Sequence, residues 1–280
     1  MTRVAVVGSY GVGLTFGVDR VPDRGESVLG SLFRTDPGGK GSNQAIGAAR
    51  LGAEVSLLTA VGDDAFGDDA FALWAAEDVD ASAVVRAPLS TMTAAILVEE
   101  TGDNRIVIVP GALSVLTAEH VDAFRPRIED ADVLLVQLEI PVATAVHALE
   151  LARAAGVRTV LNPAPAPAAP LTVQADYLTP NETEAPAVAG AEGTLVVTLG
   201  ERGAQLGAEL VPALPARAVD TTGAGDAFCA AFAVALAEGA SDLEAVRWGC
   251  AAGAHMVEHE GVVPGLPTRA ELEARLALAV

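Results

Sequence analysis

Short apolar runs alternate along this chain with longer segments in which apolar positions recur every three or four residues. The apolar runs predict buried strands at residues 4–7, 55–59, 133–137, 159–161, 177–179 and 195–199. The longer segments predict helices at residues 43–51, 65–77, 141–155 and 227–237. Strands that alternate with helices are typical of a parallel sheet covered on both faces. We therefore predict a doubly wound, mostly parallel α/β fold.

Two regions depart from this alternation. Residues 14–33 lack a helical period, and a later region reads as two strands at 94–99 and 105–109 around a turn at 101–104. Both regions are expected to be extended. Because no long linker or repeat interrupts the chain, we predict a single domain over residues 1–280.

One connection between predicted strands is short. About fifteen residues separate the strands at 177–179 and 195–199, which is close to the minimum for a parallel crossover. They include Pro180, Pro186 and Gly190, so a long covering helix is not expected there.

Charge and composition limit the classes of partner. The net charge of −20 argues against nucleic acid and anionic membranes as partners. The chain contains no run of about 18 apolar residues and no basic leader at its N-terminus, so we predict a cytoplasmic protein. Cys229 and Cys250 are predicted to be small core residues, because their spacing fits neither a metal site nor a disulfide framework.

The strongest chemical signal is the stretch Asp220-Thr-Thr-Gly-Ala-Gly-Asp226, in which a glycine loop runs into a helical pattern. The free N–H groups and the positive dipole end of a helix start bind anions. The amides of Gly223, Ala224 and Gly225 can therefore stabilise a transferring phosphoryl group, while Asp226 takes the proton of the attacking hydroxyl. The plain alternative is that Asp226 only caps the helix.

Further segments accompany this stretch in a characteristic order. They are Gly38-Gly-Lys-Gly-Ser-Asn43-Gln-Ala, Gly62-Asp-Asp-Ala-Phe-Gly67-Asp68, Gln137-Leu-Glu139-Ile-Pro141, Asn162-Pro-Ala-Pro-Ala166, Asn181-Glu-Thr-Glu184 and Thr198-Leu-Gly-Glu-Arg-Gly203. Together they resemble the ribokinase-like (PfkB) carbohydrate kinases over nearly the whole chain, most closely the bacterial ribokinases. The resemblance implies an ATP-dependent kinase that phosphorylates a hydroxymethyl group of a sugar or sugar-like alcohol with Mg²⁺. It also implies a small β-sheet lid inserted at about residues 11–36 and 90–110, through which two copies form a homodimer.

Four residues are candidates for the acceptor site. Ser42 is predicted to cap a helix that aims Lys40 and Asn43 at one point, and Glu139 follows a strand at the sheet edge where ligands of α/β proteins bind. The alternatives are a surface turn and an ordinary loop acid. The resemblance implies that Gly39, Lys40, Asn43 and Glu139 contact the sugar.

Candidates for the nucleotide site follow later strands. The resemblance implies that Asn181 and Glu184 organise Mg²⁺ and the phosphates through water, although a capping box explains the pair equally well. It implies that the ATP site is completed by Gly225, Thr198, Gly200 and Gly203, where a plain hairpin is the alternative. Cys250 lies where relatives have an adenine-side residue.

Some relatives also bind a monovalent cation such as K⁺ beside the anion hole. The resemblance places that site, largely as backbone oxygens, at Asp220, Thr222, Met256, His259, Gly261 and Gly265.

One departure from the family pattern concerns the substrate. Ribokinases usually have Asn and Asp where this chain has Gly11 and Gly13, and loss of such a charged hydrogen bond removes about 1.5–3 kcal/mol. The space left there could admit a bulkier acceptor, so a nucleoside kinase is the alternative. A lid lined by apolar side chains such as Phe16 and Ile108 would favour that alternative.

Other classes of function fit the sequence less well than a kinase does. Gly8-Ser-Tyr-Gly11-Val-Gly13 does not open a helix, which argues against NAD binding, and Arg34 and Gly41 break the P-loop pattern around Lys40. A non-catalytic sugar- or nucleotide-binding regulator would be expected to lose Asp226 first.

Overall fold

The body of the protein is a sheet of nine strands, seen in a computed structural model that describes residues 1–101 and 103–278. Its strand order is β15-β14-β13-β12-β11-β10-β1-β4-β6, parallel except for β14 and β15 at one edge. The bounds are β1 (Arg3–Val7), β4 (Glu54–Leu58), β6 (Val79–Asp80), β10 (Val133–Gln137), β11 (Arg158–Asn162), β12 (Gln174–Leu178), β13 (Glu192–Thr198), β14 (Ala204–Leu206) and β15 (Glu209–Val211).

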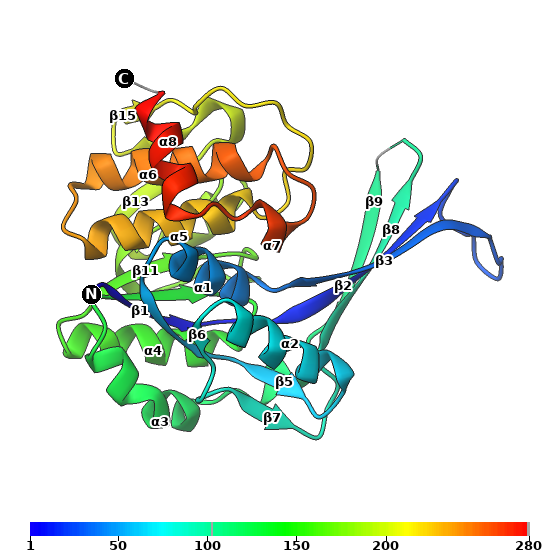
Figure 1. Cartoon of the computed structure of the whole chain (residues 1–280). Coiled ribbons are helices and arrows are strands. Elements are labelled where there is room, and N and C mark those ends of the chain that lie inside the picture. The colour runs from blue at the N-terminus through cyan, green and yellow to red at the C-terminus, as the bar shows by residue number, and fades with distance from the viewer. Residues whose placement is uncertain (102, 279–280) are drawn as a thin grey trace.

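Helices cover both faces of this sheet (Figure 1). One face packs on α1 (Lys40–Arg50), α2 (Ala65–Ala76), α5 (Ala224–Ala237), α6 (Asp242–Met256), α7 (Val262–Gly265) and α8 (Arg269–Ala277). The other packs on α3 (Ala118–Glu129) and α4 (Val142–Ala154). Successive side chains of β1 alternate between the faces, because strand residues point to opposite sides of a sheet: Val4 and Val6 join one core, Ala5 and Val7 the other. The predicted doubly wound fold is confirmed.

The start of α1 differs from the prediction. The helix begins at Lys40 after Gly39, whose φ of 89° suits glycine. Ser42 therefore lies inside the helix, and its hydroxyl accepts a hydrogen bond from Trp74 Nε1 at 2.8 Å instead of capping. The prediction of a Ser42 cap was wrong.

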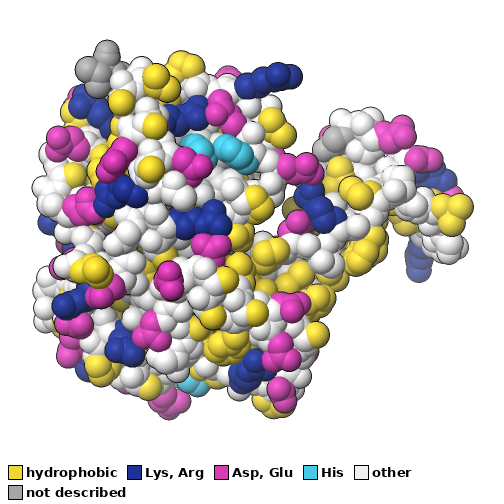
Figure 2. Space-filling view, in the orientation of Figure 1, with side chains coloured by type: hydrophobic (Ala, Val, Ile, Leu, Met, Phe, Trp, Pro, Cys, Tyr) yellow, Lys and Arg dark blue, Asp and Glu magenta, His cyan; other side chains and the backbone are white. Residues whose placement is uncertain are grey.

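A small sheet, called the lid below, projects from the body (Figure 1). Its strand order is β3-β2-β8-β9, and it stands apart from the body with hydrophobic side chains along it (Figure 2). The bounds are β2 (Gly11–Val18), β3 (Gly30–Gly38), β8 (Met92–Glu99) and β9 (Asn104–Val109). The predicted turn at 101–104 includes Gly102, which lies outside the described residues.

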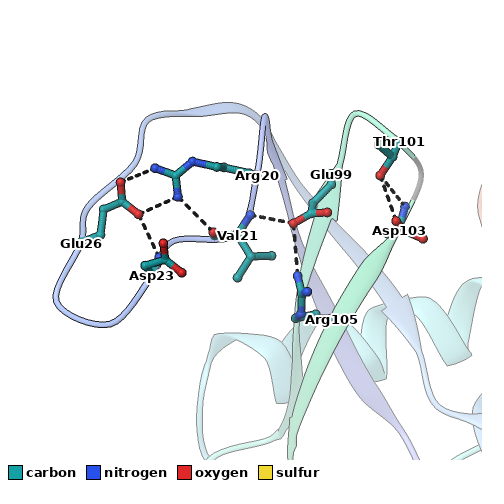
Figure 3. Close-up of polar contacts among 8 residues, drawn as sticks. All are labelled: Arg20, Val21, Asp23, Glu26, Glu99, Thr101, Asp103 and Arg105. Atoms are coloured by element: carbon teal, nitrogen blue, oxygen red, sulfur yellow. Dashed lines mark hydrogen bonds and ion pairs between the residues drawn. The ribbon is translucent and has the colours of Figure 1, made fainter.

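Polar contacts fasten the far end of the lid (Figure 3). The Glu99 carboxylate accepts hydrogen bonds from the Val21 N–H at 2.8 Å and from the Arg105 guanidinium at 3.1 Å. The connection between β2 and β3 is thereby tied to the β8–β9 hairpin, so the lid strands form one unit. A second small sheet pairs β5 (Ala60–Gly62) with β7 (Val85–Ala87).

The crossover from β12 to β13 is as short as the sequence predicts. It contains the single 3₁₀ helix η2 (Ala185–Val188). Because so little chain covers this edge, Leu195 of β13 is 40% exposed. The prediction of a buried strand at 195–199 was wrong at that position.

Within the described residues, no helix is both long and apolar enough to span a membrane.

Candidate active site

The glycine loop before α5 shapes the start of that helix. Gly223 is the N-cap with φ 81°, and a Cβ there would lie 2.6 Å from Val262 Cγ1. The helix begins at Ala224, so Asp226 lies in its first turn and is not the capping residue. The alternative of a simple Asp226 cap is therefore wrong, and the side chain is 6% exposed.

Two amides from α1 hold the Asp226 carboxylate. Asn43 Nδ2 donates to Oδ2 at 2.8 Å, and Gln44 Nε2 donates to Oδ1 at 3.0 Å. Both amides are buried, and α1 packs directly on α5. Since each oxygen has its own donor, the plane of the carboxylate is fixed.

Lys40 is the only lysine of the chain and lies among acids. Burial, the largest single influence, lowers the pKa of Lys40, but the nearby Asp226, Glu139 and Glu184 carboxylates together raise it above its ordinary value. Lys40 is therefore charged at neutral pH. A partly buried ammonium under the influence of several carboxylates suits a site that receives phosphate charge.

A cavity of about 220 Å³ opens in front of Asp226 at the carboxyl ends of β11, β12 and β13. Its walls include predicted residues from both the acceptor and nucleotide sets: Lys40, Asn181, Glu184, Thr198, Gly223, Gly225 and Asp226. They also include Asn162, Ala164, Thr179, Thr221 and Cys229, to which the sequence analysis gave no role. A cavity between a carboxylate and the N–H groups of a helix start fits a phosphate chain.

Glu139 is engaged at the first turn of α1. Its Oε2 accepts hydrogen bonds from the Ser9 hydroxyl and from the Lys40 N–H, the latter at 2.9 Å. A carboxylate at a helix N-terminus satisfies a free N–H and complements the helix dipole. Glu139 therefore fixes the backbone beside Lys40.

Asn181 and Glu184 form a reciprocal pair. The Asn181 Oδ1 accepts from the Glu184 N–H at 2.9 Å, and the Glu184 Oε2 accepts from the Asn181 N–H at 2.9 Å. Within the described residues, no group of three or more His, Cys, Asp and Glu side chains could hold a metal ion. Mg²⁺ at this place would take waters and phosphate oxygens as its main ligands, which is the coordination it commonly adopts.

Asp220 joins the two loops to which the cation site was assigned. Its Oδ1 accepts from the Thr222 N–H at 2.9 Å and its Oδ2 from the Gly261 N–H at 3.3 Å. Burial, the largest single influence, raises the pKa of Asp220, but hydrogen bonds from Thr222 and Gly261 together lower it. A cation between the loops would rely on backbone carbonyls. Gly265 lies close to this segment, since a Cβ there would be 2.8 Å from Met256 Sδ.

The lid strand β2 carries Gly11 and Gly13 next to the Gly39 turn. A Cβ on Gly39 would lie 2.9 Å from the Gly11 nitrogen, so the two segments are in contact. A Cβ on Gly11 would lie 2.3 Å from Met92 Cε. The space that a side chain at position 11 would need is thus filled by Met92, a buried apolar residue.

Some predicted residues lie outside the cavity walls. Gly200 and Gly203 belong to the η3 turn (Gly200–Arg202) and its C-cap, which leads into the β13–β14 hairpin. Cys250 packs under β15, with its Sγ 3.9 Å from the Val211 carbonyl oxygen.

Cys229 lines the cavity, and burial raises the pKa of its thiol to about 12. That thiol is therefore not a nucleophile at neutral pH.

The sequence motifs contain three further polar residues for which the sequence predicts no role: Gln44, Gln137 and Asn162. Gln137 and Asn162 are the last residues of β10 and β11, and both are buried. A polar residue that ends an otherwise apolar strand is a signal for a site at that sheet edge. That signal was available in the sequence.

Comparisons with known proteins agree with this geometry. A family model described as pfkB family carbohydrate kinase matches residues 1–269. The chain is 39% identical over 293 residues to the ribokinase of Bacillus subtilis (strain 168), with 99% of this chain and 100% of that protein covered. The solved ribokinase of Thermotoga maritima is 33% identical with a TM-score of 0.88, covering 99% of this chain and 100% of that one. The Arabidopsis thaliana ribokinase, solved with ribose and ATP, is 29% identical with a TM-score of 0.87 and 99% coverage of each chain.

Proposed function

This chain belongs to the pfkB family of carbohydrate kinases and is an ATP-dependent carbohydrate kinase, and we propose that Asp226 is the base that activates a hydroxymethyl group of its acceptor. One observation carries the proposal. Asp226 is buried at the start of α5, with both carboxylate oxygens held by amides, and it shares a cavity with Lys40, Gly223 and Gly225. This combination supplies a base and an anion site within one small volume.

The chain's residues then have distinct roles in the transfer. Asp226 accepts the proton of the acceptor hydroxyl as that oxygen bonds to the γ-phosphorus of ATP and ADP leaves. The N–H groups of Gly223, Ala224, Gly225 and Asp226 stabilise the charge that develops on the phosphoryl oxygens. Lys40 adds a fixed positive charge beside them.

Divalent and monovalent cations fit the site in different ways. Mg²⁺, when bound, would neutralise phosphate charge, and Asn181 and Glu184 would hold its waters. A monovalent cation such as K⁺ would lie between the loop at Asp220 and the segment from Met256 to Gly265, held by backbone oxygens. The bond between Asp220 and the Gly261 N–H supports this assignment, because it brings the two segments together.

For the acceptor we propose a sugar or sugar-like alcohol whose selection does not depend on the hydroxyl pair gripped by Asn and Asp in ribokinases. Glycines stand at positions 11 and 13, and Met92 fills the space beside Gly11. Gly39, Lys40, Asn43 and Glu139 remain to contact the hydroxyls nearer Asp226. Without a partner in the site, such a hydroxyl contributes no selectivity. A site discriminates against a substrate that lacks a hydroxyl because the site's own polar groups are then left unpaired.

A nucleoside is the second candidate acceptor. Ile108 of β9 is 53% exposed and pairs with Ala94, which in turn pairs with Gly13, so the three lie on one face of the lid. An exposed apolar face next to Gly13 would suit a nucleobase. Phe16 does not add to it, because its side chain lies on the opposite face of β2 from Gly11 and Gly13.

We also propose that the lid forms a homodimer contact. Residues 106–109 of the lid strand β9 are all apolar and exposed, which a monomer in water rarely tolerates.

The test is ADP release from Mg-ATP over a panel of ribose, deoxyribose, hexoses, polyols and nucleosides, with Asp226→Asn protein alongside. We expect acceptor-dependent turnover that Asp226→Asn lowers at least about a hundredfold, with ATP binding retained. Preference for ribose over deoxyribose would contradict the proposed acceptor class. Full activity of Asp226→Asn would contradict the proposed base.

A further inference from the structure

A chain of buried amides leads from the end of β10 to the Asp226 carboxylate. Gln137 Nε2 donates to Gln44 Oε1 at 2.5 Å, and Gln44 Nε2 donates to Asp226 Oδ1 at 3.0 Å. Gln44 and Gln137 are both fully buried, at 0% exposure. Buried hydrogen bonds of this kind are costly to leave unmade, so the arrangement is strongly specified.

The carboxylate sets the direction of the whole chain of amides. Asp226, when ionised, only accepts, so Gln44 must turn its NH₂ group toward it. The second hydrogen of that NH₂ group goes to Asn162 Oδ1 at 3.3 Å, and Asn162 Nδ2 donates to the Thr179 carbonyl at 2.9 Å. Gln44 Oε1 then faces Gln137, which must present its own NH₂ group to it.

Backbone packing keeps Gln137 in place. A Cβ on Gly8 would lie 1.9 Å from Gln137 Oε1, so the amide rests directly on the glycine backbone. Gln137 does not contact Asp226 in this set of hydrogen bonds; it acts on the carboxylate through Gln44. Asn43, by contrast, contacts the other carboxylate oxygen and lies beside Lys40 in α1.

We propose that Gln44, oriented by Gln137, is a positioning residue that holds Asp226 in line with the acceptor hydroxyl. The inference rests on the proposed role of Asp226 as the base. A base that rotates away from the hydroxyl loses rate without losing nucleotide affinity, because the cavity walls that meet the phosphates are unchanged. Each of the two amide groups donates to its own oxygen of Asp226, so removal of Gln44 changes the surroundings of the group that accepts the proton.

The experiment is a double-mutant cycle on kcat with Gln44→Met, Gln137→Met and the double variant. Gln44→Met is expected to lower kcat about tenfold to a hundredfold, with KM for ATP unchanged and the acidic limb of kcat against pH moved to higher pH. Gln137→Met is expected to cause a smaller loss with the same pH signature. Because Gln137 acts through Gln44, the double variant should equal Gln44→Met alone.

Two controls separate this role from a merely structural one. Thr144→Val removes another buried hydrogen bond, from Thr144 Oγ1 to the Leu116 carbonyl at 2.8 Å on the opposite face of the sheet. It should lower the melting temperature without moving the pH profile. Asp226→Asn, assayed on the same acceptor, tests the base itself.

The outcomes are distinct. If Gln44→Met keeps kcat within about twofold while Asp226→Asn is inactive, the positioning role is wrong and the base assignment holds. If the two losses multiply in the double variant, Gln137 does not act through Gln44. If Gln44→Met fails to bind ATP, the pH profile of Gln137→Met tests the positioning role instead. An acidic limb of kcat that moves to higher pH supports the role, and an unchanged limb contradicts it.

Discussion

Gly11 and Gly13 lie two residues apart on the same face of β2, but the space beside them differs. A Cβ on Gly11 would lie 2.3 Å from Met92 Cε and 2.9 Å from the Met92 carbonyl oxygen, whereas the nearest atom to a Cβ on Gly13 would be Ile96 Cδ1 at 3.4 Å. Position 11 is therefore closed by a neighbouring side chain and position 13 is open. Met92 therefore shapes the proposed acceptor site as much as the glycines do.

This difference predicts the stability of two matched variants. Gly11→Ala is expected to lower the free energy of unfolding by about 1–3 kcal/mol, the usual cost of overpacking. Gly13→Ala should change it by no more than about 0.5 kcal/mol, as most uncrowded substitutions do. Urea unfolding monitored by circular dichroism measures both, and equal losses would contradict the role of Met92. Adding Met92→Ala to Gly11→Ala should recover part of the loss, because the contact with Cε disappears.

At the scale of elements, the end of α6 is linked to α8 and to the chain before the glycine loop. Glu258 accepts hydrogen bonds from Arg275 Nη1 at 2.7 Å and from the Arg217 N–H at 3.1 Å. The bond from Arg275, followed by that from Arg217, lowers the pKa of Glu258 from 4.5 to about 2. This carboxylate therefore fastens the segment that carries the proposed cation site.

The lowered pKa of Glu258 predicts how its contribution to the free energy of unfolding changes with pH. The stabilisation from Glu258 is fully present above the unfolded-state value of 4.5 and is lost as the pH falls toward about 2. Glu258→Gln should lower the free energy of unfolding at pH 7 by about 1 kcal/mol or less, since the pair is partly exposed. The deficit should shrink between pH 4.5 and pH 2. Urea titrations at pH 7, 4 and 3 test this, with Glu150→Gln on the exposed side of α4 as the control; a deficit independent of pH would contradict the assignment.

At the scale of the whole molecule, the lid leaves apolar surface uncovered. Val107 is 63% exposed and Ile106 is 52% exposed, on opposite faces of the edge strand β9. Figure 2 shows the lid extending away from the body, so the body itself does not cover this surface. A second copy of the chain is the occupant that we propose.

This arrangement predicts a concentration-dependent dimer. Val107→Glu should shift the protein toward the monomer, because it places a charge in the proposed contact. Leu210→Glu provides the matched control, since Leu210 is a similarly exposed apolar residue at 55%, on β15 of the main sheet. Sedimentation velocity over a range of concentrations measures the change. A wild-type monomer at tens of micromolar, or equal behaviour of the two variants, would contradict the lid contact.

The sequence by itself determined the architecture, the family and the class of reaction. Short continuous apolar runs and helical segments of period 3.6 are local signals, so β10 was predicted to the residue and α2 and α4 nearly so. The run from Asp220 to Asp226 predicts an anion-binding loop for the same reason, because its residues are contiguous in the chain. The individual roles assigned to the site residues stay predictions that the proposed assays test.

Only the tertiary structure decided which distant side chains meet. Gln44 and Asp226 are 182 positions apart, and Gly11 and Met92 belong to different strands that pair in register. Neither contact has a local signature, because hydrogen bonding and steric exclusion between elements depend on packing and not on period. The start of α1 at Lys40 shows the same limit: Ser42 is a good capping residue in isolation, but its hydroxyl bonds Trp74 of a different helix. Local patterns therefore fixed which elements form, and packing fixed what their side chains do.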